Sequence, residues 1–72
     1  MPKLYSSDHI IRVIERHGFT FVSSRGSHAK FRSIAGDTRY TVIVPLNKKE
    51  IPYGTFRSIL RQSGLIVEVF GK

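Results

Sequence analysis

The amino-acid sequence predicts an α+β fold in which two helices cover one face of a three-stranded antiparallel sheet. Two segments, Ser7–His17 and Gly54–Ser63, carry apolar residues at the spacing of an amphipathic helix. Between them lie three short runs with strand-like patterns, and turn residues separate these runs. We therefore expect the order α-β-β-β-α, with the second face of the sheet left for a ligand.

Length and composition limit the class of protein. With 72 residues, the chain is long enough for one domain, residues 1–72, and its 40% hydrophobic content supports a globular core. It has no cysteine, which excludes disulfides, thiolate metal ligands and a catalytic cysteine. No apolar run approaches the length of a membrane span, and the first residues lack an apolar signal region. We expect a cytoplasmic protein with no membrane partner.

Each expected helix has recognisable ends. Ser6 or Ser7 can cap the first helix, and Gly18 follows its last turn as a C-terminal glycine. Gly64 has the same place after the second helix, Gly54–Ser63. The last segment, Leu65–Phe70, is compatible with a strand, a short helix or a disordered contact segment, and its pattern does not choose between them.

The three strand-like runs are Phe19–Ser23, His28–Ser33 and Arg39–Val44. In the second run, Ala29 and Phe31 point to one face, while His28, Lys30 and Arg32 point to the other. The third run is rich in β-branched residues and stops at a proline. Short turns between the runs predict an antiparallel meander.

The positive charge is concentrated in one part of the chain. There are 12 Lys and Arg residues against 5 Asp and Glu, a net charge of +7. Eight of the basic residues but only two of the acidic ones lie between positions 25 and 61, so this window carries +6. The eight are Arg25, Lys30, Arg32, Arg39, Lys48, Lys49, Arg57 and Arg61. Such an asymmetry favours a nucleic-acid-binding face over an ordinary solvated surface.

Two further observations concern phosphate and metal binding. Lys48-Lys49 is expected just before the second helix, where free backbone N–H groups also attract phosphate. The acidic residues are scattered, and His9 and His17 are separated by roughly 12 Å along the first helix. We expect His9 to be solvated and His17 to face the negative end of the helix dipole. The sequence therefore predicts no metal site and no cofactor.

His28 is the candidate catalytic residue. It follows Gly26-Ser27 at the start of a strand and shares a face with two cations. Histidine titrates near neutral pH and is suited to general acid–base chemistry. RNA supplies its own nucleophile, the 2′-hydroxyl, so a histidine beside cations suffices for a metal-independent ribonuclease. An exposed histidine after a hairpin glycine accounts for the same pattern.

The sequence also resembles a known family. The blocks Gly18-Phe19, Arg25-Gly26-Ser27-His28, Val44-Pro45 and Gly54–Gly64 are similar to those of the HicA (YcfA-like) toxins of HicA–HicB toxin–antitoxin pairs. The likeness runs from about Ser7 to Leu65. It implies a fold like that of the double-stranded-RNA-binding domain. It also implies a metal-independent endoribonuclease, an mRNA interferase that cleaves mRNA and inhibits translation.

In this resemblance, His28 corresponds to the family's catalytic histidine. RNA binding is expected from Gly26, Ser27, Lys30, Arg32, Lys48, Lys49 and Arg57. The expected protein partner is a HicB-like acidic antitoxin, through which alone DNA would be contacted. The sequence departs from the family at Ala29, where many members have a histidine or an aromatic residue, and at Leu46-Asn47, where many have a histidine. These departures concern a second proton-transfer group.

Two other functions fit the same sequence. One is a non-catalytic module that binds double-stranded RNA, and the other is a regulatory interaction protein that uses Leu65–Phe70. An antitoxin would also need apolar anchors on this chain. The candidates are Ile43, Tyr53, Val67, Val69 and Phe70, although the last segment could instead cover the protein's own core.

Overall fold

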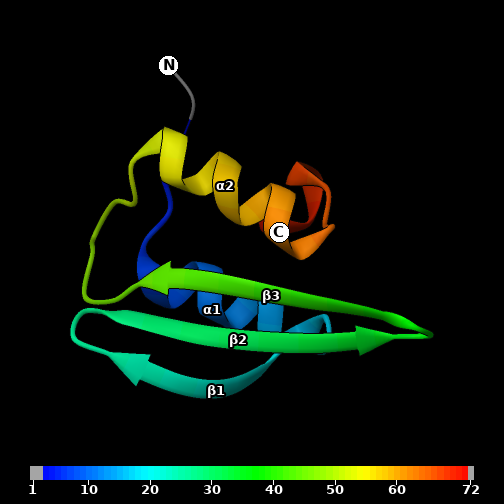
Figure 1. The fold of residues 1–72 in the computed structure, drawn as a ribbon. Helices are drawn as coiled ribbons and strands as arrows, with labels where there is room; N and C mark the ends of the chain where they lie inside the picture. Colours follow the sequence, from blue (N-terminus) through cyan, green and yellow to red (C-terminus); the bar gives the residue numbers. More distant parts are fainter. Residues whose placement is uncertain (1–2, 72) are drawn as a thin grey trace.

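The computed structural model describes residues 3–71 and has the predicted order of elements (Figure 1). The elements are α1 (Ser7–Arg16), β1 (Thr20–Arg25), β2 (His28–Ala35), β3 (Thr38–Pro45), α2 (Tyr53–Ser63) and the 3-10 helix η1 (Val67–Gly71). The strands form one antiparallel sheet in the order β1-β2-β3. Both helices contribute to the same core on one face of this sheet, which confirms the predicted α+β fold. Within residues 3–71, no helix is long and apolar enough to cross a membrane.

Helix α1 begins where its sequence predicts. Ser6 is the N-cap, and its side chain accepts a hydrogen bond from the backbone N–H of His9 (3.1 Å). The helix ends one residue earlier than expected, because His17 is the C-cap. Its Nδ1 atom lies 2.9 Å from the carbonyl oxygen of Val13, in the last turn of the helix. Gly18 follows with φ 93°, a value that favours glycine over residues with a side chain.

The strands are longer than the sequence predicted, because residues beyond the predicted ends also pair with the neighbouring strand. The expected Phe19–Ser23, His28–Ser33 and Arg39–Val44 become Thr20–Arg25, His28–Ala35 and Thr38–Pro45. Each hairpin therefore has a loop of only two residues, with a positive-φ glycine first: Gly26 (58°) and Gly36 (60°). This arrangement is typical of type II′ turns, whose twist matches that of the flanking strands.

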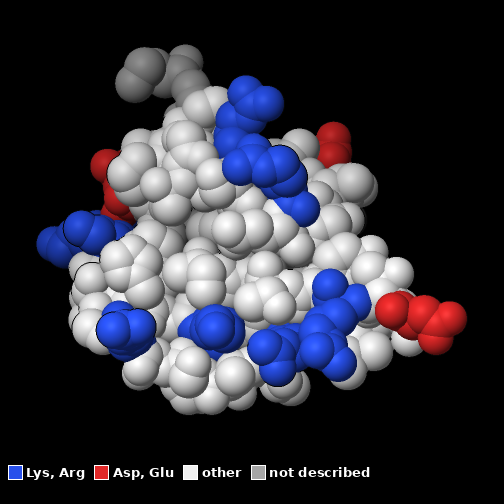
Figure 2. Space-filling view, in the orientation of Figure 1, with Lys and Arg blue, Asp and Glu red and all other residues white. Residues whose placement is uncertain are grey.

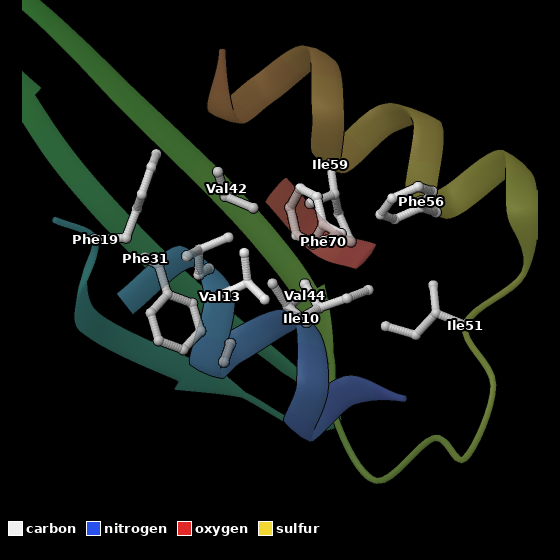
Figure 3. Close-up of a cluster of buried hydrophobic side chains, with 12 residues drawn as sticks. Ile10, Val13, Phe19, Phe31, Val42, Val44, Ile51, Phe56, Ile59 and Phe70 are labelled. Atoms are coloured by element: carbon white, nitrogen blue, oxygen red, sulfur yellow. The ribbon is translucent and has the colours of Figure 1, made fainter. Parts of the chain in front are cut away.

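The alternation along the strands divides the sheet into a buried face and an open face. Ala29, Phe31, Val42 and Val44 are at most 3% exposed and face the helices. They join apolar side chains of α1 and α2 in the core (Figure 3). The opposite face is covered by no helix and carries His28 and the cations next to it on β2. This open face is the sheet face that was expected to bind a ligand.

The C-terminal segment belongs to the core. Phe70, in η1, is completely buried, and its ring packs edge-on against Phe56 at 5.1 Å between centroids. Its carbonyl oxygen lies 2.6 Å from Nε2 of His9, and Tyr5 stacks on that imidazole at 4.8 Å. Of the open alternatives for Leu65–Phe70, the structure has the short helix. The prediction that Phe70 could anchor a partner protein is therefore wrong, because its side chain is buried. The prediction that His9 is a solvated residue is also wrong, because its ring contacts Phe70 and Tyr5.

Candidate functional site

His28 is the first residue of β2 and is held by both neighbouring strands. It pairs with Arg25 of β1 on one side and with Pro45 of β3 on the other. The turn before it is fixed by a 2.7 Å hydrogen bond from the backbone N–H of Leu46 to the carbonyl oxygen of Ser27. Because three backbone segments meet at this residue, its Cα position is well defined although its side chain is exposed.

Ser7, the first residue of α1, forms hydrogen bonds with this end of the sheet and with the loop that follows it. Ser7 is 1% exposed, and its hydroxyl donates a 2.6 Å hydrogen bond to the carbonyl oxygen of Pro45. The same hydroxyl accepts from the backbone N–H of Lys48 (3.0 Å), and the Ser7 N–H donates to the Lys48 carbonyl oxygen (2.9 Å). These bonds fix the start of the loop after β3, directly beside the His28 pairing site.

The imidazole of His28 has one contact with a neighbouring side chain. Its Nδ1 atom lies 3.3 Å from Oγ of Ser27. A hydroxyl can accept from Nδ1–H or donate to an unprotonated Nδ1. When Ser27 accepts, Nε2 carries the lone pair that a general base needs. Ser27 therefore has the position of a residue that orients the histidine.

A hollow of about 560 Å³ lies at this end of the open face. Within the described chain its lining contains no acidic side chain and consists of Ser23, Ser24, Arg25, His28, Ala29, Lys30 and Ile43. The guanidinium group of Arg25, the ammonium group of Lys30 and the imidazole of His28 thus border the same hollow. The predicted residues His28 and Lys30 are brought together here.

Arg25 is the charged residue of this hollow that the sequence analysis did not assign to the site. It appeared there only among the basic residues of the central window, because Ser23-Ser24-Arg25 lacks any apolar alternation. The signal that could have identified it is the turn. A two-residue turn at Gly26-Ser27 requires Arg25 to pair with His28, which places their side chains on the same face of the sheet.

The other predicted binding residues lie outside the hollow. Arg32 is on the open face, one side-chain position further along β2, and its Nε atom is buried without a hydrogen-bond partner among residues 3–71. Lys48 and Lys49 are exposed on the loop after β3, and Arg57 is exposed on α2. The lysine pair lies, as predicted, in the loop before the second helix, α2, which begins at Tyr53.

The cations on the side of the molecule seen in Figure 2 form three groups. One row of Lys and Arg side chains crosses the sheet, a second group lies over α2 with an uncharged strip between it and the row, and a third lies at the left edge of the view. The acidic side chains in this view lie at its margins. Of the basic residues at positions 25–61, Arg25 and Lys30 line the hollow.

Within residues 3–71, no group of three or more His, Cys, Asp or Glu side chains is placed to hold a metal ion. Two of the three histidines of the chain are engaged elsewhere: His9 contacts the carbonyl group of Phe70, and His17 contacts that of Val13. His28 is thus the one histidine that borders the hollow.

Comparison with known proteins gives the family. A comparison with curated protein sequences found no significant match. The family model described as the HicA toxin of bacterial toxin–antitoxin systems matches residues 7–65, which include both long helices and all three strands. A toxin of this kind implies a cognate antitoxin as a partner. From the match over most of its length, together with the predicted fold, we conclude that the chain belongs to the HicA toxin family.

Proposed function

We propose that this protein is an mRNA interferase, a metal-independent endoribonuclease in which His28 is the general base. The observation that carries the proposal is the hollow, where the imidazole lies among the cations Arg25 and Lys30 and no carboxylate competes with a phosphate. Phosphodiester cleavage builds negative charge on the non-bridging oxygens, and fixed cations next to that charge stabilise the transition state. Cleavage of mRNA in the cytoplasm would inhibit translation.

The chemical step needs only the groups of the hollow and the RNA itself. Nε2 of His28 removes the proton of a ribose 2′-hydroxyl, and the 2′-oxygen attacks the adjacent phosphorus. The bond from phosphorus to the 5′-oxygen breaks, which leaves a 2′,3′-cyclic phosphate on one fragment and a 5′-hydroxyl on the other. The leaving oxygen takes its proton from Lys30 or from water, since the hollow contains no second histidine.

The product ends and the response to chelators test this mechanism. We expect purified protein to cleave single-stranded RNA at an unchanged rate in excess EDTA, because none of the proposed steps uses a metal ion. The 3′ ends should be 2′,3′-cyclic phosphates or their hydrolysis products, as identified by mass spectrometry. RNA with a 2′-deoxy substitution at the cleaved nucleotide should resist cleavage. Activity that is lost in EDTA and restored by Mg²⁺ would contradict the mechanism.

Arg25 should contribute a phosphate contact. We expect Arg25→Gln to reduce the dependence of RNA affinity on salt, with the slope of log K against log salt falling by about 0.7 for single-stranded RNA. The control is Arg12→Gln, which removes an exposed arginine from α1, away from the open face. Fluorescence titrations at several salt concentrations measure both slopes. Equal slopes for the two variants would show that phosphate is not bound at Arg25.

We also propose that the antitoxin is a HicB-like acidic protein that docks on the open face and covers His28. The cations that would bind phosphate would attract its acidic side chains, which speeds association at low salt. Ile43, Tyr53 and Val67 remain candidate apolar anchors, since they are 36%, 46% and 48% exposed, whereas Val69 is partly buried against the core. DNA would be contacted only through this partner.

A further inference from the structure

Ile43 is the apolar side chain among the charged groups of the hollow. It lies on β3, is 36% exposed and pairs with Lys30 on the open face. It is therefore a diagonal neighbour of His28, and such neighbours lie about 7–8 Å apart in an antiparallel sheet. One nucleotide can span that separation, so a base next to the phosphate at His28 can reach Ile43.

Gln62 of α2 adds a fixed amide group beside Ile43. The backbone N–H of Ile43 points out of the free edge of β3 and donates to Oε1 of Gln62 at 3.1 Å. Because an N–H can only be accepted by the oxygen of this amide, the orientation of the group follows from the bond. The Nε2 group of this exposed side chain then has two N–H bonds to offer to a ligand.

The surroundings favour RNA over a protein as the ligand of this pair. Ile43 pairs with Lys30 on the neighbouring strand, and its backbone N–H is bonded to Gln62 of α2, the helix that also carries Arg57 and Arg61. Figure 2 shows an uncharged strip between the cations on the sheet and those over α2. A strand of RNA whose phosphates follow the cations on the sheet would place its bases over such a strip. An apolar side chain offers a base face a contact surface, and an amide beside it can read the base edge.

We propose that Ile43 and Gln62 form a nucleobase subsite that selects a base whose major-groove edge carries a keto oxygen, guanine or uracil, next to the cleaved phosphate. The proposal rests on the proposed function. An amide reads adenine by accepting from N6 and donating to N7. One of the two lone pairs of the Gln62 oxygen already accepts from Ile43, which makes this oxygen a weaker acceptor for a second donor. The two N–H donors match O6 and N7 of guanine or O4 of uracil, whereas the N6 amino group of adenine or the N4 amino group of cytosine would face these donors.

The test compares binding ratios between bases rather than absolute affinities. We use His28→Ala protein, which should bind RNA without cleaving it, and short RNAs in which one position at a time carries each of the four bases. At one position, guanine or uracil should bind about tenfold more tightly than adenine or cytosine. Adding Gln62→Glu should abolish this ratio, because the new carboxylate keeps an acceptor for Ile43 N–H but loses both donors. Gln62→Met, an uncharged variant, should abolish it as well.

A neighbouring substitution and the melting temperature serve as controls. Arg61→Gln, one residue away on α2, should weaken all the RNAs equally and leave the ratio unchanged. The Gln62→Glu variant should melt close to the temperature of its parent, because the edge of β3 remains capped.

The possible failures are distinguishable. An unchanged base ratio in Gln62→Glu would assign Gln62 only a structural role and overturn the subsite. If the wild-type protein cleaves RNA without any base preference, the subsite is overturned but the proposed ribonuclease function is not. Substitutions at Ile43 and Gln62 that weaken only antitoxin binding would reassign the surface to the protein partner. A chain that neither binds nor cleaves RNA would overturn both proposals.

Discussion

Replacing His28 with alanine is expected to lower the rate of RNA cleavage by about 10²- to 10⁴-fold, the usual contribution of a general acid–base group. The fold should remain intact, because the side chain is exposed and its one side-chain contact is the 3.3 Å approach to Ser27. Single-turnover rates on a defined RNA, with thermal melting of the same samples, measure the two effects separately.

The matched control for this variant is His17→Ala. His17 is also exposed, but it lies at the end of α1 and contacts only the end of its own helix. We expect His17→Ala to cleave RNA at the wild-type rate. Equal cleavage by the His28→Ala and wild-type proteins would remove His28 from the mechanism. If both proteins bound RNA and neither cleaved it, the non-catalytic binding module would be the better description.

Phe70→Ala should be the most destabilising of the substitutions considered. Removing a buried phenylalanine typically costs about 3–5 kcal/mol, while small domains unfold with only about 5–15 kcal/mol. The ring packs against Phe56 and Tyr5, with centroid distances of 5.1 and 6.4 Å, so its loss leaves a cavity between α1, α2 and η1. Chemical denaturation followed by circular dichroism measures the free energy of unfolding.

Val67→Ala is the control for Phe70→Ala in the same 3-10 helix. Val67 is 48% exposed, so its truncation should change the free energy of unfolding by less than about 1 kcal/mol. Deletion of residues 66–72 should destabilise the protein at least as much as Phe70→Ala. A deletion that leaves the melting temperature unchanged but weakens antitoxin binding would instead support a docking role for the C-terminal segment.

The parts of the fold that the sequence predicts are those with a regular hydrophobic period. The helices and the central strand have clear patterns, and their buried faces are the expected ones: Ile10 and Val13 on α1, and Ala29 and Phe31 on β2. Strand β1 is exposed along its whole length, so its polar end carries no alternation and reads as a turn. The pairing of Arg25 with His28 could not be predicted from the sequence for the same reason.

Contacts between distant segments explain what the sequence could not predict. Leu65–Phe70 has too few residues to show a period, and its place depends on Tyr5 and His9 at the other end of the chain. Gln62 gave no signal either, because a single polar residue on an amphipathic helix is ordinary. Its importance in the structure comes from the one backbone N–H of β3 that it meets.

The contact between His9 and Phe70 joins residues 61 positions apart in the sequence. Proteins are synthesised from the N-terminus, and contacts between distant residues form late and slowly in folding. A nascent chain that has not yet released Phe70 from the ribosome lacks one part of its core, and a small domain has little free energy of unfolding to lose. We therefore expect the growing polypeptide to be harmless to the cell that makes it. Its toxicity would begin only after Phe70 has left the ribosome and packed into the core.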